Sequence, residues 1–254
     1  MCGIVGLIQK QKKVEKGLFE TMVSTLSRRG PDQQGKYLAG NVALGQTRLS
    51  IVDLSENGKQ PMFNEDGSIA IVFNGEIYNF QKVKKGLKRK HVWNSVSDTE
   101  SIVHGYEEYG QNIVKHLDGM FAFGIYDQYK NIITLGRDRF GKKPIYYYLD
   151  ENSFCFASEL KAIVSNPNIK RKLILNYSAI EKFVFYGYIP SPETIYKNVY
   201  KLEAATTLQF DIDNWKLINK KRYWDLGQIA IVDDLNEVEI IDKVDRLLDS
   251  SVRK

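Results

Sequence analysis

The chain has 254 residues, with 36 basic against 31 acidic side chains and a formal net charge of +5. Hydrophobic residues make up 43% and charged residues 26%, which is the composition of a folded globular protein and excludes the disordered and fibrous classes. The basic residues are scattered, and no basic face with base-stacking aromatic side chains can be assembled, so we expect no nucleic-acid partner. No run approaches the roughly 20 apolar residues of a membrane span, so we expect no membrane partner.

The cysteine count and the N-terminal residues indicate the compartment. The two cysteines, Cys2 and Cys155, are too few for the disulfide framework of a secreted protein. The apolar residues 4–8 are too short for a signal peptide, and no basic region precedes them. These features predict a cytoplasmic protein.

Short runs rich in β-branched and aromatic residues, separated by Gly, Asn and Asp, dominate the first two-thirds of the chain and predict strands. The predicted strands cover residues 3–8, 42–44, 69–73, 121–126, 132–136, 145–149 and 154–157. Apolar residues at helical spacing predict helices over residues 17–28, 99–109, 178–186 and 235–252. Several strands in series, then helices, then more strands are typical of an α+β sandwich rather than a parallel βαβ fold.

The start of the predicted helix at residue 99 has a capping signature. In the run Ser97-Asp98-Thr99-Glu100, Ser97 is expected to cap the helix, with Glu100 reaching back to complete a capping box.

Cys2 is the first residue with chemical potential. Removal of Met1 would make this cysteine N-terminal, and its own α-amine, with a reference pKa of about 8, could then act as the general base. No histidine partner is needed, and His91, His104 and His116 lie in no triad-like context. The alternative for any cysteine is a small buried apolar residue, which is the interpretation we adopt for Cys155 in its apolar strand.

Asn74 and Gly75 follow a predicted strand. An Asn side-chain amide and an adjacent Gly backbone N–H form a suitable oxyanion hole for a tetrahedral intermediate. The alternative is structural, because Asn-Gly between two strand-like runs is also the strongest short-range signal for a β-hairpin.

Three charged residues complete the predicted site. Arg48 could hold a substrate carboxylate through a bidentate pair, although an ion pair within the fold is the alternative. Asp98 could bind a cationic amine together with Glu76, or could simply favour the N-terminal dipole of its helix. An anionic carboxylate, a cationic amine and an amide carbonyl attacked by a thiol together describe glutamine as the ligand.

Two other kinds of site are not indicated. Residues 136–143 (GRDRFGKK) resemble a P-loop, but Lys143 stands where Ser or Thr is required, and Pro144 with a β-run follows instead of a helix. We therefore reject nucleotide binding at this loop. The spacing of Cys, His and carboxylate residues predicts no metal centre.

The motifs occur in an order that resembles one known family. They are residues 1–6 (MCGIVG), 28–32 (RRGPD), 48–53 (RLSIVD), 74–79 (NGEIYN), 97–100 (SDTE), 119–123 (GMFAF), 137–144 (RDRFGKKP) and 157–162 (ASELKA). This series resembles the N-terminal glutaminase domain of glutamine-hydrolysing asparagine synthetases, which are class II, or N-terminal nucleophile, amidotransferases. The resemblance covers about residues 2–210. Later matches at residues 186–190, 201–202 and 223–224 favour this branch over its phosphoribosyl- and glucosamine-forming relatives.

The resemblance implies the N-terminal nucleophile hydrolase fold, a four-layer αββα sandwich of two antiparallel sheets. It implies that Cys2 attacks the glutamine amide, that ammonia leaves, and that a γ-glutamyl thioester is hydrolysed to glutamate. Asn74 and Gly75 would form the oxyanion hole. The implied substrate-binding residues are Arg48, Leu49, Ser50, Ile51, Val52, Glu76 and Asp98.

The resemblance also predicts the domain organisation. Residues 2–212 would form the type-2 glutamine amidotransferase domain, and residues 213–254 a linker and the first helix of a C-terminal synthetase domain. We expect no cofactor in this chain, and ATP with Mg²⁺ in the synthetase domain, where aspartate would become asparagine. Dimers are frequent in this family, so a homodimer is one expected assembly.

Two alternatives to this function remain open. Close relatives amidate other acceptors, such as a sugar acid in surface polysaccharide synthesis. An alternative of another class is a catalytically silent scaffold domain.

Overall fold

Strand β1 (Gly3–Gln9) runs through the middle of the first of two sheets. Its residues are all buried, and it pairs antiparallel with β3 on one side and with β9 on the other. The computed structural model describes residues 1–51, 53–228 and 235–253. The strand order in this sheet is β10-β8-β9-β1-β3-β2. Its other strands are β2 (Gln33–Ala39), β3 (Val42–Arg48), β8 (Tyr146–Leu149), β9 (Ser153–Ala157) and β10 (Val199–Lys201).

The second sheet is also antiparallel, with the order β12-β11-β7-β6-β5-β4. Its longest strands are β5 (Ile69–Ile77) and β6 (Gly119–Asp127), which pair along their whole length. The other strands are β4 (Met62–Phe63), β7 (Ile132–Arg137), β11 (Thr206–Asp211) and β12 (Lys216–Arg222).

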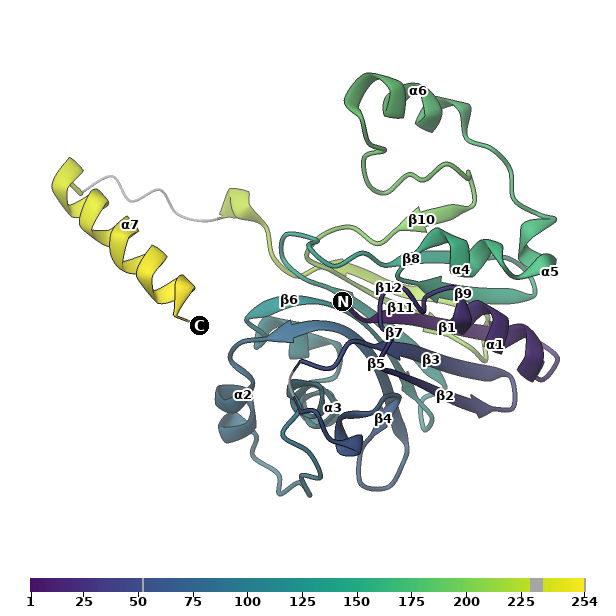
Figure 1. Cartoon of the computed structure of the whole chain (residues 1–254), viewed down its shortest axis with the longest axis horizontal. Coiled ribbons are helices and arrows are strands. Elements are labelled where there is room, and N and C mark those ends of the chain that lie inside the picture. Colours follow the sequence, from purple (N-terminus) through teal and green to yellow (C-terminus); the bar gives the residue numbers. More distant parts are fainter. Residues whose placement is uncertain (52, 229–234, 254) are drawn as a thin grey trace. The chain divides into compact units, whose positions relative to one another are not determined.

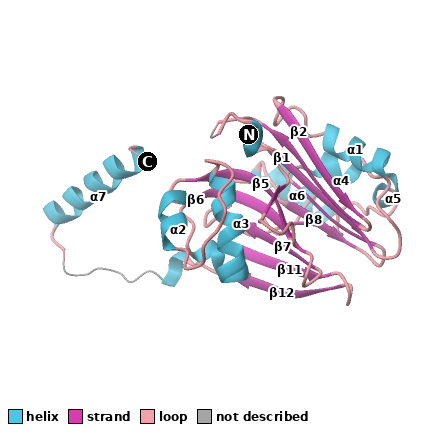
Figure 2. Ribbon diagram, turned by 90° about the horizontal axis from the view of Figure 1, so that it is seen from below, coloured by secondary structure: helices cyan, strands magenta, loops and turns pink. Residues whose placement is uncertain are grey.

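Helices cover the outer faces of the two sheets (Figure 2). On the outer side of the first sheet lie α1 (Lys16–Ser24), α4 (Leu160–Val164) and α5 (Pro167–Lys170), and on the outer side of the second lie α2 (Phe80–Gly86) and α3 (Asp98–Tyr109). The remaining helices are α6 (Tyr177–Tyr186) and α7 (Glu237–Val252), with short 3-10 turns at Glu56–Gly58, Gly110–Lys115 and Leu226–Gln228.

Three buried apolar clusters hold these layers together. One lies between the two sheets and includes Ile4 and Leu44 from the first sheet and Val72 and Ala122 from the second. A second cluster packs α1, α4 and α5 on the first sheet, and a third packs α2 and α3 on the second. The layers are therefore helix, sheet, sheet and helix, which confirms the fold that the family resemblance implied.

A buried hydrogen bond connects the two sheets close to the ends of β3 and β5. The side-chain amide of Gln46 in β3 donates to the backbone oxygen of Phe73 in β5 at 2.8 Å. Because Arg48 ends β3 and Asn74 follows Phe73, this contact fixes the two predicted site strands relative to each other.

Two sequence interpretations are corrected. Asn74 and Gly75 form no hairpin turn, because both lie inside β5, opposite Ala122 and Phe121 of β6. The predicted capping box is only half formed. Ser97 accepts from the backbone N–H of Thr99, but the carboxylate of Glu100 accepts from the backbone N–H groups of Asn94 and Ser95 instead.

The chain divides into two compact units, Met1–Trp224 and Asp225–Lys254 (Figure 1). Strand β12 belongs to the first unit and lies beyond the boundary at residue 212 drawn from the sequence. In the second unit, α7 begins with a capping box of Asn236 and Glu239. Among the described residues, none of the helices combines the length and apolarity needed to cross a membrane.

Candidate active site

A cavity of about 140 Å³ lies where the start of β1, the end of β3, the C-terminal half of β5 and the start of α3 meet. It brings together most of the residues singled out in the sequence, namely Cys2, Arg48, Leu49, Ile51, Asn74, Gly75, Glu76 and Asp98. Ser50 does not line this cavity; its backbone N–H donates to the carboxylate of Asp32 at 2.8 Å. Val52 lies outside the described residues.

Cys2 directly precedes β1 and is partly buried. Its thiol points to the backbone oxygen of Leu49 at 3.7 Å, and its own backbone oxygen accepts from Nε of Arg29 at 2.8 Å. Burial raises the pKa of the Cys2 thiol, against the lowering influence of the Leu49 contact and of the nearby positive charges. A thiol with a raised pKa is protonated at neutral pH, so this sulfur needs a base before it can attack.

Met1 and Lys143 lie in the same cavity as Cys2. The ammonium of Lys143 donates to the sulfur of Met1 at 3.2 Å, so the first side chain occupies part of the space beside the thiol. Burial lowers the pKa of Lys143, and the neighbouring charge of Arg29 lowers it further.

Asn74 has an unusual environment for an amide. Its side chain is 1% exposed, and neither the oxygen nor the nitrogen of the amide has a hydrogen-bond partner among the described residues. A buried polar group without a partner costs free energy, so such a group in a cavity indicates a site for a ligand. Asn74 lines the same cavity as the Cys2 thiol.

Gly75 is required by close strand packing. A Cβ at this position would lie 2.2 Å from the backbone oxygen of Met120 in the neighbouring strand. Only glycine therefore permits β5 and β6 to approach each other here, next to Asn74.

Arg48 lines the cavity but also supports the loop that follows it. Its guanidinium donates to the side chain of Gln33 at 2.9 Å and to the backbone oxygens of Ser55 and Asp53. Gly58 leaves room for this group, because a Cβ there would lie 2.2 Å from Nη2 of Arg48. Arg48 therefore supports the loop of Asp53 and Ser55, and its role in ligand binding stays a prediction.

Asp98 is the first residue of α3 and is 5% exposed. Its Oδ2 atom accepts from the backbone N–H of Ile77 at 2.8 Å, which ties the helix to the end of β5. Burial raises the pKa of Asp98, and the negative charge of Glu76 raises it further. A cationic ligand between these two carboxylates would relieve that repulsion.

Sequence reasoning did not identify the residues that hold this site in place. Arg29 binds the backbone of Cys2, Asp32 binds that of Ser50, and Gln60 bridges the backbone of Phe73 and the hydroxyl of Thr99. The first two belong to the RRGPD motif at residues 28–32, so the motif was visible although its role was not. Gln60 belongs to none of the sequence motifs, so nothing in the sequence indicated its role.

Among the described residues, one group of side chains could hold a metal ion, namely Glu65, His91, His104 and Glu107. None of the four lines the cavity at Cys2.

The fold and the arrangement of a thiol, an unpartnered amide and paired charges define a class of nucleophilic amide hydrolases. The family model described as a glutamine amidotransferase domain matches residues 1–224, and the chain belongs to this family.

The chain is similar in sequence to curated proteins of this family that are named asparagine synthetases. The chain is 39% identical over 271 aligned residues to a "Putative asparagine synthetase [glutamine-hydrolyzing] 2" of Methanocaldococcus jannaschii, covering 100% of this chain and 52% of that protein. It is 36% identical over 243 residues to "Asparagine synthetase [glutamine-hydrolyzing] 3" of Bacillus subtilis, covering 93% of this chain and 39% of that protein. The chain thus spans about half the length of these relatives or less.

A solved structure supports the fold. The glutamine phosphoribosylpyrophosphate amidotransferase of B. subtilis superposes with a TM-score of 0.62 at 18% identity, covering 88% of this chain and 49% of that chain. At this identity the likeness concerns the fold alone.

Proposed function

We propose that Cys2 is the nucleophile that hydrolyses glutamine to glutamate and ammonia in this domain. Removal of Met1 would free the α-amine of Cys2. It would also remove the Met1 side chain from the cavity, where the sulfur of Met1 now accepts from Lys143. The amine, with a reference pKa of about 8, is a suitable base for a thiol whose pKa is raised by burial.

The proposed reaction has two steps. The amine takes the thiol proton, the sulfur attacks the amide carbon, and the amide donors of Asn74 and Gly75 hold the oxyanion. Collapse of this intermediate breaks the C–N bond, and the same proton leaves with ammonia. Water, activated by the amine, then hydrolyses the γ-glutamyl thioester to glutamate and restores the thiol.

The substrate's α-carboxylate and α-amine would be held at opposite sides of the cavity. Arg48 carries the positive charge suited to the carboxylate, with the backbone from Leu49 to Ile51 beside it. Glu76 and Asp98 supply the negative charge suited to the amine. The pKa of Asp98 is raised by burial and by the negative charge of Glu76, and a bound cationic amine would stabilise the ionised carboxylate.

One observation carries this proposal. The buried amide of Asn74 has no hydrogen-bond partner among the described residues, and it lines the same cavity as the Cys2 thiol. A silent scaffold would have no reason to keep a buried donor unpaired beside a thiol, because an apolar residue there would be more stable.

The test is a glutaminase assay on two samples of the chain. One begins at Cys2, and the other keeps additional residues before it. We expect glutamate and ammonia in equal amounts from the first sample and none from the second. A folded, correctly processed sample without turnover would instead support the silent scaffold.

Arg48→Lys separates the two roles of Arg48. Lysine keeps the charge but cannot form a planar bidentate pair, so we expect KM for glutamine to rise about tenfold or more, with a smaller change in kcat. Steady-state kinetics measure both constants, and thermal unfolding measures stability. A wild-type KM with lowered stability would show that Arg48 only supports the loop of Asp53 and Ser55.

We also propose that the ammonia is used by a second domain of the same protein. Because the relatives are longer than this chain, we infer a synthetase domain in the same polypeptide, with ATP and Mg²⁺, that converts aspartate to asparagine in the cytoplasm. Apolar side chains on two helices offer surfaces for such a domain. In α6, Phe183, Val184 and Phe185 are exposed, and in α7, Val238, Ile241, Val244, Leu247 and Leu248 are exposed.

The alternative acceptor is a sugar acid, and product analysis of the full-length protein with aspartate, ATP and glutamine distinguishes the two. Asparagine as the product supports the first acceptor. Glutamate release without asparagine supports another one.

A further inference from the structure

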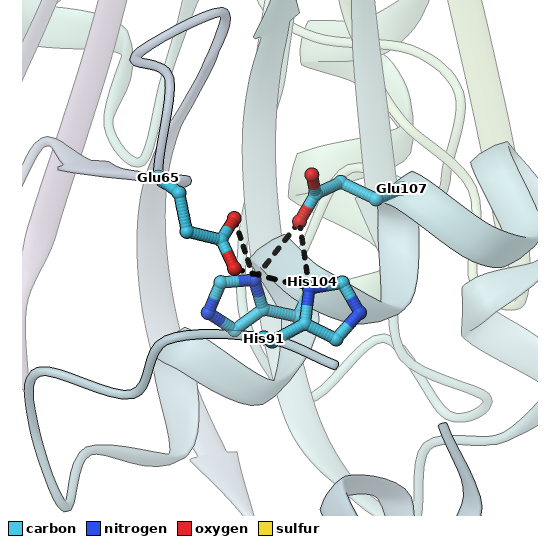
Figure 3. Close-up of side chains that lie close together, drawn as sticks. All are labelled: Glu65, His91, His104 and Glu107. Carbon is cyan, nitrogen blue, oxygen red and sulfur yellow. Dashed lines mark hydrogen bonds and ion pairs between the residues drawn. The ribbon is translucent and has the colours of Figure 1, made fainter. Parts of the chain in front are cut away.

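Two histidines and two glutamates meet at one point outside the glutamine cavity (Figure 3). Glu65 lies in the turn between β4 and β5, His91 in the segment between α2 and α3, and His104 and Glu107 one turn apart in α3. The two imidazoles are 4.4 Å apart between ring centroids, and their Nδ1 atoms face both carboxylates.

The distances between these imidazoles and carboxylates are close to those of a tetrahedral metal site, and one ligand atom from each residue lies within 4.8 Å of the other three. Nδ1 of His91 lies 3.3 Å from Glu65 and 3.4 Å from Glu107, and Nδ1 of His104 lies 3.6 Å and 2.9 Å from the same two carboxylates. Metal–ligand distances of about 2.0–2.1 Å give tetrahedral edges of about 3.3–3.4 Å. The four observed distances scatter around that value, with Oε1 of Glu65 facing His91 and Oε2 of the same carboxylate facing His104.

The second nitrogen of each imidazole, Nε2, also has the surroundings of a metal-binding histidine. Nε2 of both histidines is buried and has no hydrogen-bond partner among the described residues. Nε2 of His91 faces the carboxylate of Glu108 at 3.6 Å, and Nε2 of His104 faces that of Glu100 at 3.8 Å. A carboxylate behind the outer N–H is the usual support of a metal-binding histidine, since it orients the ring and raises its basicity.

The carboxylates are themselves held in place. The other oxygen of Glu107 accepts from the side chain of Asn64 at 3.1 Å, and Glu65 accepts from the backbone N–H of Val92 at 2.8 Å. The backbone N–H of Arg89 donates to Glu108, and that of Asn94 donates to Glu100, both at 2.7 Å. The ligand atoms are therefore preorganised by the segment that contains His91.

Charge balance also favours a cation. Four carboxylates surround two imidazoles, and the side chains of His91 and His104 are only 4% and 1% exposed. A divalent cation bound to neutral imidazoles would offset half of this negative charge at its centre.

From this geometry we propose that Glu65, His91, His104 and Glu107 bind one Zn²⁺ ion. Two imidazole nitrogens and two carboxylate oxygens in a tetrahedron suit zinc better than Ca²⁺ or Mg²⁺, which take oxygen ligands in larger numbers. Four protein ligands make it a closed, structural site. The ion would tie the turn at Glu65 and the segment at His91 to α3, whose first residue is Asp98 of the glutamine cavity.

The test measures metal in the untagged chain, independently of glutamine hydrolysis. After incubation with ZnCl₂ and removal of excess metal, we expect one zinc per chain by elemental mass spectrometry. Substitution with Co²⁺ should give the strong visible absorption of a tetrahedral cobalt site. A chelator should lower the Tm, and added zinc should restore it. A chain that retains no zinc would overturn the proposal and leave the cluster as hydrogen bonds between histidines and carboxylates.

Variants locate the ion. His104→Gln and Glu65→Gln should each lose the stoichiometric zinc, whereas His116→Gln, which changes a histidine stacked on Tyr109, should retain it. Glu65 is 30% exposed, so its variant is expected to fold even where loss of buried His104 prevents folding. Full zinc content and unchanged cobalt absorption in folded Glu65→Gln would contradict the assigned ligands.

Discussion

We expect Cys2→Ala to abolish glutamine hydrolysis, with a loss on the order of 10⁶-fold in kcat, as removal of the nucleophile does in serine proteases. The fold should remain intact, because Cys2 precedes β1 and is only partly buried. Glutamate release measures the loss, and circular dichroism with thermal unfolding checks the fold.

Cys155→Ala is the matched control. Cys155 is fully buried in the apolar cluster beneath α1 and α4, and it pairs with Leu7 of β1, away from the start of the chain. Its replacement should cost stability but leave kcat near the wild-type value. Comparable activity in Cys2→Ala, or loss of activity in a folded Cys155→Ala, would contradict the assignment of the nucleophile.

Asn74→Ala should lower kcat by about 10²–10³-fold, which is the effect of removing one oxyanion-hole donor, while KM for glutamine changes little. The amide has no hydrogen-bond partner among the described residues, so truncation breaks no bond within the described fold. Steady-state kinetics with glutamine measure both constants.

The isosteric Asn74→Asp variant sharpens this experiment. Aspartate fits the same space but offers only acceptors when ionised, so it should lose at least as much activity as alanine. Asn79→Ala, outside the cavity, is the control and should keep the wild-type kcat. A wild-type kcat in Asn74→Ala would assign the oxyanion to other donors.

Much of the fold could be predicted from local pattern. The strands predicted at residues 3–8, 69–73 and 121–126 are β1, β5 and β6, because short apolar runs rich in β-branched and aromatic residues are a property of the buried strand itself. The strand ends were less predictable. Residues 74–77 continue β5 although Asn and Gly favour turns, since pairing with β6 outweighs local preference.

Most residues that line the candidate site could be named from the sequence, but the contacts among them could not. Cys2 was identified from its position after Met1, and Asn74 with Gly75 from their chemistry. The additional bonds of Arg48 to Gln33, Ser55 and Asp53 depend on the course of a loop, which no local pattern specifies.

The cluster of Glu65, His91, His104 and Glu107 could not be predicted from local sequence patterns either. Only His104 and Glu107 are close in sequence, three residues apart on one helix, and that pair alone is common on protein surfaces. Glu65 and His91 reach them through the packing of α3 against the second sheet and the path of the preceding segment. Such a group becomes visible only in three dimensions.

The most direct test of the central claim is rapid acid quenching of the chain, with Cys2 as its first residue, during turnover of glutamine. Peptide mass spectrometry should find one γ-glutamyl group on the peptide that contains Cys2, and this adduct should disappear once glutamine is exhausted. Steady turnover with the adduct on any other residue, or with Cys2 unmodified throughout while Cys2→Ala remains active, would contradict the account.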